Sequence, residues 1–291
     1  MKTEQPFISI VLGSYNRRAF LKATIKNIRE HTIEFPYEII VVDGGSTDGA
    51  LEWLAKQKDI LTIVQHNRGK RLDGSAVLRR SWGYFMNLAF KAAQGKYILM
   101  ISDDCLLVPG AIKNGAALFE ELLGKGEKVG AVAFYWRNWP KHKDYYVGRT
   151  LGKKLFVNHG LYLRDAIEKV GWIDEQSYKF YYADSDLCLR LWNAGYCVVD
   201  CKTAFVEHYN HLKAERISYS DDLDVYLKKW AGIFYDPEKD DFGGKAYLSF
   251  IDKTKTYKKF PVGRIPFLEN FLNLQKKSRR LFKRIKKMFV R

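Results

Sequence analysis

The first 135 residues alternate between strand-like and helix-like patterns, and this alternation limits the possible folds more than any other feature of the chain. Short apolar runs typical of buried strands cover residues 7–12, 38–43, 61–64, 97–101 and 129–136. Segments with apolar residues at helical spacing cover residues 16–30, 49–56, 81–93 and 109–123. The order predicts an α/β fold with a mainly parallel sheet that is flanked by helices on both faces.

The pattern changes after residue 136. We expect a strand over 155–163, a helix over 184–194, short strands over 196–200 and 204–206, a helix over 221–230, and linkers at 243–244 and 261–266. The chain therefore divides into an α/β domain over residues 1–215, an extension over 216–262 that packs on this domain, and a basic amphipathic helix over 263–291.

Positive charge is concentrated at the end of the chain. The formal net charge is +16, and residues 253–291 hold fourteen Lys or Arg against one acidic residue, Glu269. The nearly balanced remainder argues against a protein that grips nucleic acid over its whole surface. For residues 263–291 we considered a solvated helix, a nucleic-acid contact and an interfacial helix. The last is favoured, because Lys and Arg alternate with apolar residues as they do in helices that lie on anionic membranes.

The sequence also bears on the compartment. No apolar run approaches the roughly 18 residues that span a bilayer, and the polar start predicts no secretory signal. Four cysteines at these spacings form neither a disulfide framework nor a zinc site. We therefore expect a cytoplasmic protein that is peripheral on the cytoplasmic face of the membrane.

Polar clusters follow three of the expected strands. They are Ser14-Tyr15-Asn16-Arg17, Asp43 and Asp103-Asp104. In open α/β sheets, ligands bind beyond the carboxyl ends of the strands, so these clusters should share one edge. A glycine-rich dinucleotide fingerprint and a P-loop are both missing from the sequence.

Carboxylates in two of the clusters suggest chemistry. Asp103 and Asp104 repel each other unless a cation lies beside them, and Mg²⁺ or Mn²⁺ commonly joins such carboxylates to phosphates. The alternative is an ordinary strand end with a capping Asp. Asp43 is an acceptor for ribose or base groups in the functional interpretation, although Asp often follows a strand.

A third acidic cluster begins the helix expected at 184–194. Asp186 is best explained by its favourable interaction with the helix dipole. Asp184 lies at or before the helix cap and is instead a candidate general base. His208 matters only if the fold returns it to Asp104.

In this order, the segments resemble the family 2 glycosyltransferases, which are inverting nucleotide-sugar enzymes of GT-A fold. The resemblance rests on ISIVLGSYNR, EIIVVDGGSTDGA, NLAFKAAQGKYILMISDDC, VGWIDEQSYKFYYADSDLCLRLWNAGY and VEHYNH. It covers about residues 6–211. Two positions depart from the family pattern, because Ser102 replaces the first acid of the D-x-D motif and Ala183 replaces the Glu before the catalytic Asp.

The resemblance implies a role for each matching residue. Asp184 is the catalytic base, Asp104 ligates the metal ion, Asp103 contacts the ribose or the metal shell, and His208 completes that shell. The residues implied at the nucleotide and donor sugar are Ser14, Tyr15, Asn16, Arg17, Asp43, Asn158 and His159. Arg71, Arg79 or Arg80 could reach the diphosphate on the chemistry of Arg alone, with a solvated loop charge as the alternative for each.

The implied reaction is transfer of a sugar from a nucleoside-diphosphate sugar, a UDP-sugar in the favoured case, to an acceptor hydroxyl. Mn²⁺ or Mg²⁺ is the implied cofactor, and a cell-surface glycan or its lipid-linked precursor is the implied acceptor. No nucleic-acid partner is expected. The alternatives are a nucleotidyltransferase and a catalytically degenerate sugar-nucleotide-binding protein, which Ser102 and Ala183 keep open.

Overall fold

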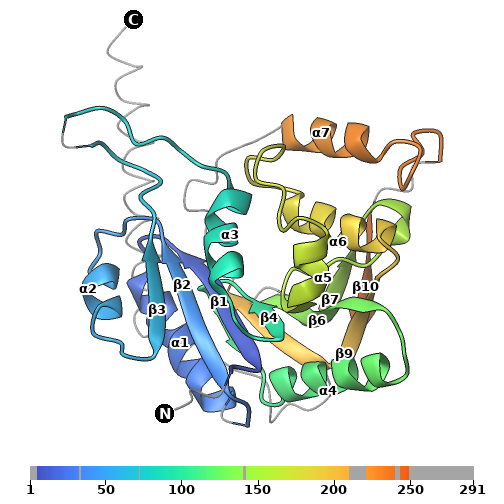
Figure 1. Ribbon diagram of the computed structural model, residues 1–291, viewed down its shortest axis with the longest axis horizontal. Coiled ribbons are helices and arrows are strands. Elements are labelled where there is room, and N and C mark those ends of the chain that lie inside the picture. Colours follow the sequence, from blue (N-terminus) through green and yellow to red (C-terminus); the bar gives the residue numbers. More distant parts are fainter. Residues whose placement is uncertain are drawn as a thin grey trace, which may run out of the picture.

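A ten-stranded mixed sheet forms the centre of the computed structural model, which describes residues 5–32, 34–71, 73–139, 142–209, 221–239 and 243–248 (Figure 1). The strands are β1 (Ile8–Ser14), β2 (Tyr37–Asp43), β3 (Ile60–Val64), β4 (Tyr97–Met100), β5 (Cys105–Leu107), β6 (Val129–Trp139), β7 (Tyr145–Arg149), β8 (Gly160–Leu163), β9 (Cys197–Tyr209) and β10 (Gly244–Leu248). The helices are α1 (Arg18–His31), α2 (Ala50–Leu54), α3 (Trp82–Ala92), α4 (Ala111–Gly124), α5 (Arg164–Lys169), α6 (Ala183–Asn193) and α7 (Asp221–Trp230).

One half of the sheet is parallel. Its strands lie in the order β4-β1-β2-β3, and every neighbouring pair is parallel. Ser14 pairs with Asp43 at the last position of β1 and β2, so the two strands end level with each other. The α/β fold with a mostly parallel sheet and flanking helices is therefore confirmed.

The other half is largely antiparallel and departs from the expectations in detail. The strand expected over 155–163 begins only at Gly160, and β5, β7 and α5 were not predicted. The two short strands expected at 196–200 and 204–206 are one strand, β9, which runs parallel to β6 with irregular register near Phe134. The linker expected at 243–244 is wrong at its second residue, since Gly244 begins β10 and pairs with Arg149 of β7.

Two apolar layers cover the sheet, one on each face. Val11 packs in a layer with Met86 and Phe90 of α3, whereas its neighbours Ile10 and Leu12 pack in a layer that includes α1 and α4. Figure 1 shows α3, α5 and α6 on one side and α1 and α4 on the other. Burial of both faces explains why the strand sequences are continuous apolar runs rather than alternating ones.

The expected helix at 221–230 is α7. Buried Asp222 accepts hydrogen bonds from the backbone N–H groups of Lys179, Phe180 and Tyr181, at 2.8–2.9 Å. The linker expected at 261–266 and the basic helix expected at 263–291 lie outside the described residues. Within the part of the chain that the structure describes, no helix combines the length and apolarity needed to cross a membrane.

Candidate functional site

The carboxyl edge of the parallel strands gathers the polar clusters that the sequence singled out. Because β1, β2 and β4 run parallel, Ser14, Asp43 and the turn after β4 reach the same edge. The Ser14 hydroxyl donates a 2.8 Å hydrogen bond to Oδ2 of Asp103. The Thr24 hydroxyl of α1 is 2.9 Å from the carbonyl oxygens of both Asp103 and Cys105, and these contacts tie the turn after β4 to α1.

Asp43 shapes its own turn. The carboxylate is fully buried and accepts hydrogen bonds from the N–H groups of Gly45 and Ser46 and from the Ser46 hydroxyl, at 2.6–2.8 Å. Asn16 closes the same turn, because its Oδ1 accepts from Thr47 N–H at 2.7 Å. Asp43 therefore presents a rigid loop of backbone groups at the edge, and most of its own hydrogen-bonding capacity is already used.

Tyr15 lies between this turn and an arginine that the sequence did not single out. A side chain at Gly44 would meet the Tyr15 ring at about 3.0 Å, so the turn packs closely on the ring. The guanidinium of Arg68 lies 4.7 Å from the centre of the same ring. Arg71 is exposed, and its backbone N–H donates to Ser75 within its own loop.

Arg17 bridges the acidic pair. Its Nη1 lies 2.8 Å from Oδ1 of Asp103 and 3.0 Å from Oδ2 of Asp104, and both carboxylates are almost completely buried. Burial alone lowers the pKa of Arg17, but attraction to the two carboxylates more than offsets it and raises the pKa. Burial also raises the pKa of Asp103 to about 6, since Arg17 compensates only in part and Asp104 repels. The arginine thus supplies the cation that two neighbouring carboxylates require.

The fold returns His208 to Asp104, which is the condition set from the sequence. Pairing of β5 with β9 places His208 opposite Cys105, and Nε2 of His208 lies 3.4 Å from Oδ1 of Asp104. Nδ1 lies 2.8 Å from the amide oxygen of Asn138. Because that oxygen only accepts, Nδ1 carries a proton, and Nε2 is the ring nitrogen that faces Asp104.

His159 lies behind this group. Its ring centre is 5.7 Å from that of His208, and its nitrogens lie 3.8–3.9 Å from Sγ of Cys105. Burial, with His208 adding to it, lowers the pKa of His159 to about 3. The His159 imidazole is therefore neutral at physiological pH, and it packs as a buried polar side chain beside His208.

The donor atoms around Asp104 fit a divalent cation. They are carboxylate oxygens and an imidazole nitrogen, a mixed set that suits Mn²⁺ better than Mg²⁺, which prefers oxygen. Among the described residues, no three or more His, Cys, Asp or Glu side chains are grouped as a complete metal site. Any ion held by Asp104 and His208 therefore needs further ligands, such as phosphate oxygens and water, and must displace or share the contacts of Arg17.

Asp184 occupies the first turn of α6. Its Oδ1 accepts from Ser185 N–H at 2.8 Å, and its Oδ2 accepts from the amide of Asn158 at 3.3 Å. Burial raises the pKa of Asp184 to about 6, against the opposing hydrogen bond from Ser185. Tyr182, directly before α6, has a left-handed backbone with φ of 64°, a strained conformation for a bulky residue that is often found at functional sites.

Asn158 and His159 connect the two chemical centres. Asn158 contacts Asp184, while the adjacent His159 lies beside His208 and Asp104. One dipeptide therefore joins the candidate base to the acidic pair, although these groups come from distant parts of the sequence.

Asp186 has a structural role that exceeds the predicted dipole interaction. It is fully buried and bonded to the side chains of Tyr178, Arg190, Lys229 and Trp230, at 2.8–3.0 Å. Arg190, one helical turn later, was the only partner that spacing within the helix could have indicated. Lys229 and Trp230 come from α7.

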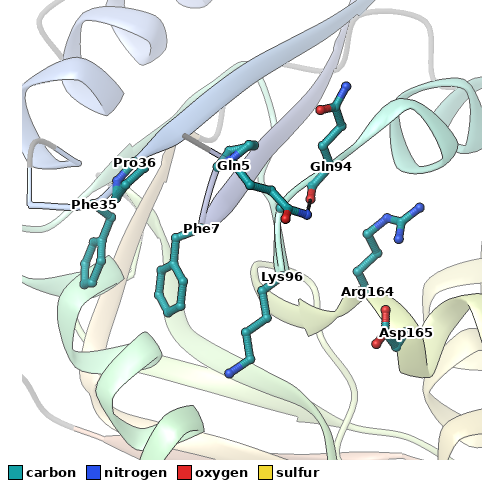
Figure 2. Close-up of a pocket in the computed structure, with 10 residues that line it drawn as sticks. Gln5, Phe7, Phe35, Pro36, Gln94, Lys96, Arg164 and Asp165 are labelled. Carbon is teal, nitrogen blue, oxygen red and sulfur yellow. Dashed lines mark hydrogen bonds between the residues drawn. The ribbon is translucent and has the colours of Figure 1, made fainter. Parts of the chain in front are cut away.

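A surface hollow of about 690 Å³ lies elsewhere, at the amino ends of β1, β2 and β4 (Figure 2). Its lining residues include Phe7, Phe35, Lys96 and Arg164. The predicted site residues do not line it, because they lie at the opposite edge of the sheet.

Comparison with known proteins identifies a family. The model for glycosyl transferase family 2 matches residues 9–169. A stretch of 104 residues is 28% identical to the putative teichuronic acid biosynthesis glycosyltransferase TuaG of Bacillus subtilis, and covers 36% of this chain and 38% of TuaG. The chain thus spans about two fifths of that relative's length.

Two solved structures share the fold. Staphylococcus aureus TarS 1–349 in complex with UDP-GlcNAc matches with a TM-score of 0.55 and 16% identity, over 76% of this chain and 64% of that one. The mannosyltransferase PcManGT from Pyrobaculum calidifontis, in complex with GDP-Man and Mn²⁺, matches with a TM-score of 0.51 and 18% identity, over 73% of this chain and 59% of that one. At these identities the likeness concerns the fold.

Proposed function

This chain belongs to glycosyl transferase family 2 and has the GT-A fold, and from that premise we propose that it is an inverting glycosyltransferase. It would move a sugar from a nucleoside-diphosphate sugar to an acceptor hydroxyl. The observation that carries the proposal is the link through Asn158 and His159, which places a carboxylate of raised pKa near a buried acidic pair. A general base and a diphosphate site are the two parts that such a reaction needs.

The mechanism follows from these parts. Asp184 accepts the proton of the acceptor hydroxyl while that oxygen attacks the anomeric carbon. The bond from the anomeric carbon to the donor phosphate breaks, and its electron pair leaves with the nucleoside diphosphate. Attack from the face opposite the leaving group inverts the anomeric centre in one displacement, so a single base suffices. Asn158 holds the base carboxylate in place through the hydrogen bond to Oδ2.

We assign the metal position to Asp104 and His208, with Asp103 beside them, and Mn²⁺ is favoured over Mg²⁺ by the imidazole. A bound divalent cation would stabilise the negative charge of the leaving diphosphate as a Lewis acid. The Mn²⁺ in the PcManGT complex supports the presence of a divalent cation, and the choice of residues rests on the donor atoms around Asp104.

The remaining assignments rest on the relatives and on charge. A UDP-sugar is the favoured donor, with a GDP-sugar as the alternative, because the matched structures hold UDP-GlcNAc and GDP-Man. The names of the relatives favour a cell-surface glycan or its lipid-linked precursor as the acceptor. The basic residues of 263–291 support peripheral contact with an anionic membrane.

Thermal stability tests the proposed function. UDP at about 100 times its Kd, with Mn²⁺, is expected to stabilise the folded chain by about 2.7 kcal/mol, which raises Tm by several degrees. EDTA is expected to remove the shift, because the diphosphate then loses its cation. GDP, dTDP, CDP and ADP serve as comparisons. No shift with any of them would contradict a donor site, and a shift only with nucleoside triphosphates would favour a nucleotidyltransferase.

Arg17 gives a second prediction. Arg17→Ala is expected to tighten Mn²⁺ binding without nucleotide by about tenfold, because it removes a cation that contacts both carboxylates. In EDTA the same variant is expected to melt at a lower temperature than the wild type, since the acidic pair loses its counter-ion. The free Mn²⁺ signal in electron paramagnetic resonance measures the affinity directly.

Arg18→Ala is the matched control, because the guanidinium of Arg18 lies 3.4 Å from the carbonyl oxygen of Asp48, away from the acidic pair. Its Mn²⁺ affinity should equal that of the wild type. Weaker Mn²⁺ binding by Arg17→Ala would refute competition and would make Arg17 a support of the metal position.

A further inference from the structure

A basic loop joins β3 to α3 beside the candidate site. We call its residues 67–71 and 73–80 the basic arm, and Figure 1 shows this loop projecting beyond the sheet. The basic arm holds a single acid, Asp73. Its five basic residues are Arg68, Lys70, Arg71, Arg79 and Arg80.

The cations of the basic arm are exposed, and within the described residues none of the five forms an ion pair. Asp73 offsets one of the five positive charges, and its Oδ1 accepts hydrogen bonds from the N–H and the hydroxyl of Ser75, at 2.9 and 2.6 Å. Residues 1–252 carry a net charge of only +3. The basic arm is therefore a local concentration of positive charge on an otherwise nearly neutral body.

Both ends of the basic arm are fastened to the candidate site. At its start, Asn67 N–H donates to the carbonyl of Gly44, directly after Asp43. After its end, Trp82 N–H donates to the carbonyl of Lys179, in the segment that leads to Asp184. The basic arm thus runs from the nucleotide side of the site to the side of the base.

Two arginines of the basic arm are positioned by aromatic rings. Arg68 lies over Tyr15 at 4.7 Å, and Arg80 lies over Tyr84 at 5.0 Å. Stacking holds the plane of a guanidinium and leaves its N–H edge available. That edge matches the oxygens of a phosphate or a carboxylate in pairs.

We propose that the basic arm binds an acceptor glycan that carries repeated phosphate or carboxylate groups. This inference rests on the proposed function and names its acceptor class. A donor brings one diphosphate, which the acidic pair and its cation accommodate. One diphosphate does not need five further cations along a loop that spans the site. A glycan with regularly spaced anions can instead pair with several of these cations at once.

Lysine footprinting on the whole chain of residues 1–291 tests the proposal locally, so that the basic residues of 253–291 do not obscure the result. Lys70 is acetylated with and without oligogalacturonate or inorganic polyphosphate, and mass spectrometry measures the rate. Either polyanion is expected to slow acetylation of Lys70 at least about fivefold, a protection that neutral dextran does not give. Lys56 and Lys58 are exposed before β3 at the opposite edge of the sheet and should be unaffected.

Matched variants test whether the cations act together. With Arg79→Ala and Arg80→Ala combined, about tenfold more polyanion is expected to be needed for the same protection of Lys70. Lys56→Ala with Lys58→Ala removes two charges as well and should need the wild-type concentration. Equal concentrations for all three proteins would overturn the proposal.

The other sources of anions are separated in the same assay. Protection of Lys70 by UDP or pyrophosphate but not by the polyanions would assign the basic arm to the donor and overturn the proposal. Protection only by vesicles that contain phosphatidylglycerol would assign it to a membrane and do the same. If the proposed function itself were wrong, the wild-type chain would show no rise in Tm with any nucleotide.

Discussion

Replacing Asp184 with asparagine is expected to lower kcat by about 10²- to 10⁴-fold, the usual contribution of a general base. The amide keeps the shape of the side chain but cannot take the proton of the acceptor hydroxyl. UDP binding with Mn²⁺ should stay within about twofold of the wild type, because we propose that the metal ion is held by Asp104 and His208 and not by Asp184. The measurement is sugar transfer under saturating donor, with the thermal shift as the binding assay.

Asp165→Asn is the control, since this Asp is exposed on α5 and belongs to neither centre. It should transfer at the wild-type rate. Wild-type transfer by Asp184→Asn would show that another group is the base. Loss of both transfer and the UDP shift would point to a structural defect.

The same residue sets the expected pH dependence. Because the base must be ionised, kcat/KM should rise with pH and reach half its maximum near pH 6, the pKa of Asp184. The effect on stability has the opposite sign. The Asp184 carboxyl has a pKa of about 3.9 in the unfolded chain and binds its proton more tightly in the folded chain. Between about pH 3.9 and pH 6, the folded state therefore loses stability as pH rises. At pH 7 we therefore expect Asp184→Asn to be at least as stable as the wild type.

Asp186→Ala is expected to destabilise the fold by about 3–5 kcal/mol, the range for a buried ion pair that loses one partner. The change leaves Arg190 and Lys229 without their shared carboxylate, and Tyr178 and Trp230 without their acceptor. We expect Tm to fall by about 10 °C, as measured by calorimetry.

Asp224→Ala provides the comparison, because Asp224 is exposed on α7 and should change Tm little. Asp186→Asn keeps the volume of the side chain and should lie between the two. A Tm of Asp186→Ala within a degree of the wild type would exclude the stabilising role. The contrast with Asp184 is informative. The two acids are two positions apart in the sequence, yet we expect Asp184 to affect catalysis and Asp186 to affect stability.

The sequence was sufficient for the parallel half of the sheet. Strands β1, β2 and β4 are mainly apolar and largely buried, and the rule for parallel strands then places Ser14, Asp43 and Asp103 at one edge. The sequence alone did not predict that His208 lies beside Asp104, because this contact depends on the pairing of β5 with β9. β5 is three residues long, too short to give a periodic signal.

The details of the site depend on backbone geometry that no residue pattern encodes. Arg17 was expected at the nucleotide, yet its guanidinium contacts the acidic pair. The preceding residue, Asn16, has a left-handed backbone with φ of 51°, which the sequence pattern does not indicate. Arg68 was missed because a loop arginine has no periodicity, and only the fold brings it onto Tyr15. Likewise, the partners of Asp186 on α7 lie more than 40 residues away in the sequence.

The contacts of α7 have a consequence for the order in which the protein matures on the ribosome. The strands that hold the acidic pair, β1, β2 and β4, end by residue 100, so that half can assemble early in synthesis. The helix that carries Asp184 is different, because Asp222 fixes the segment before it and Lys229 and Trp230 bind Asp186 inside it. A nascent chain can therefore assemble the half with the acidic pair first, and the helix that carries Asp184 is secured only after residue 230 has left the exit tunnel.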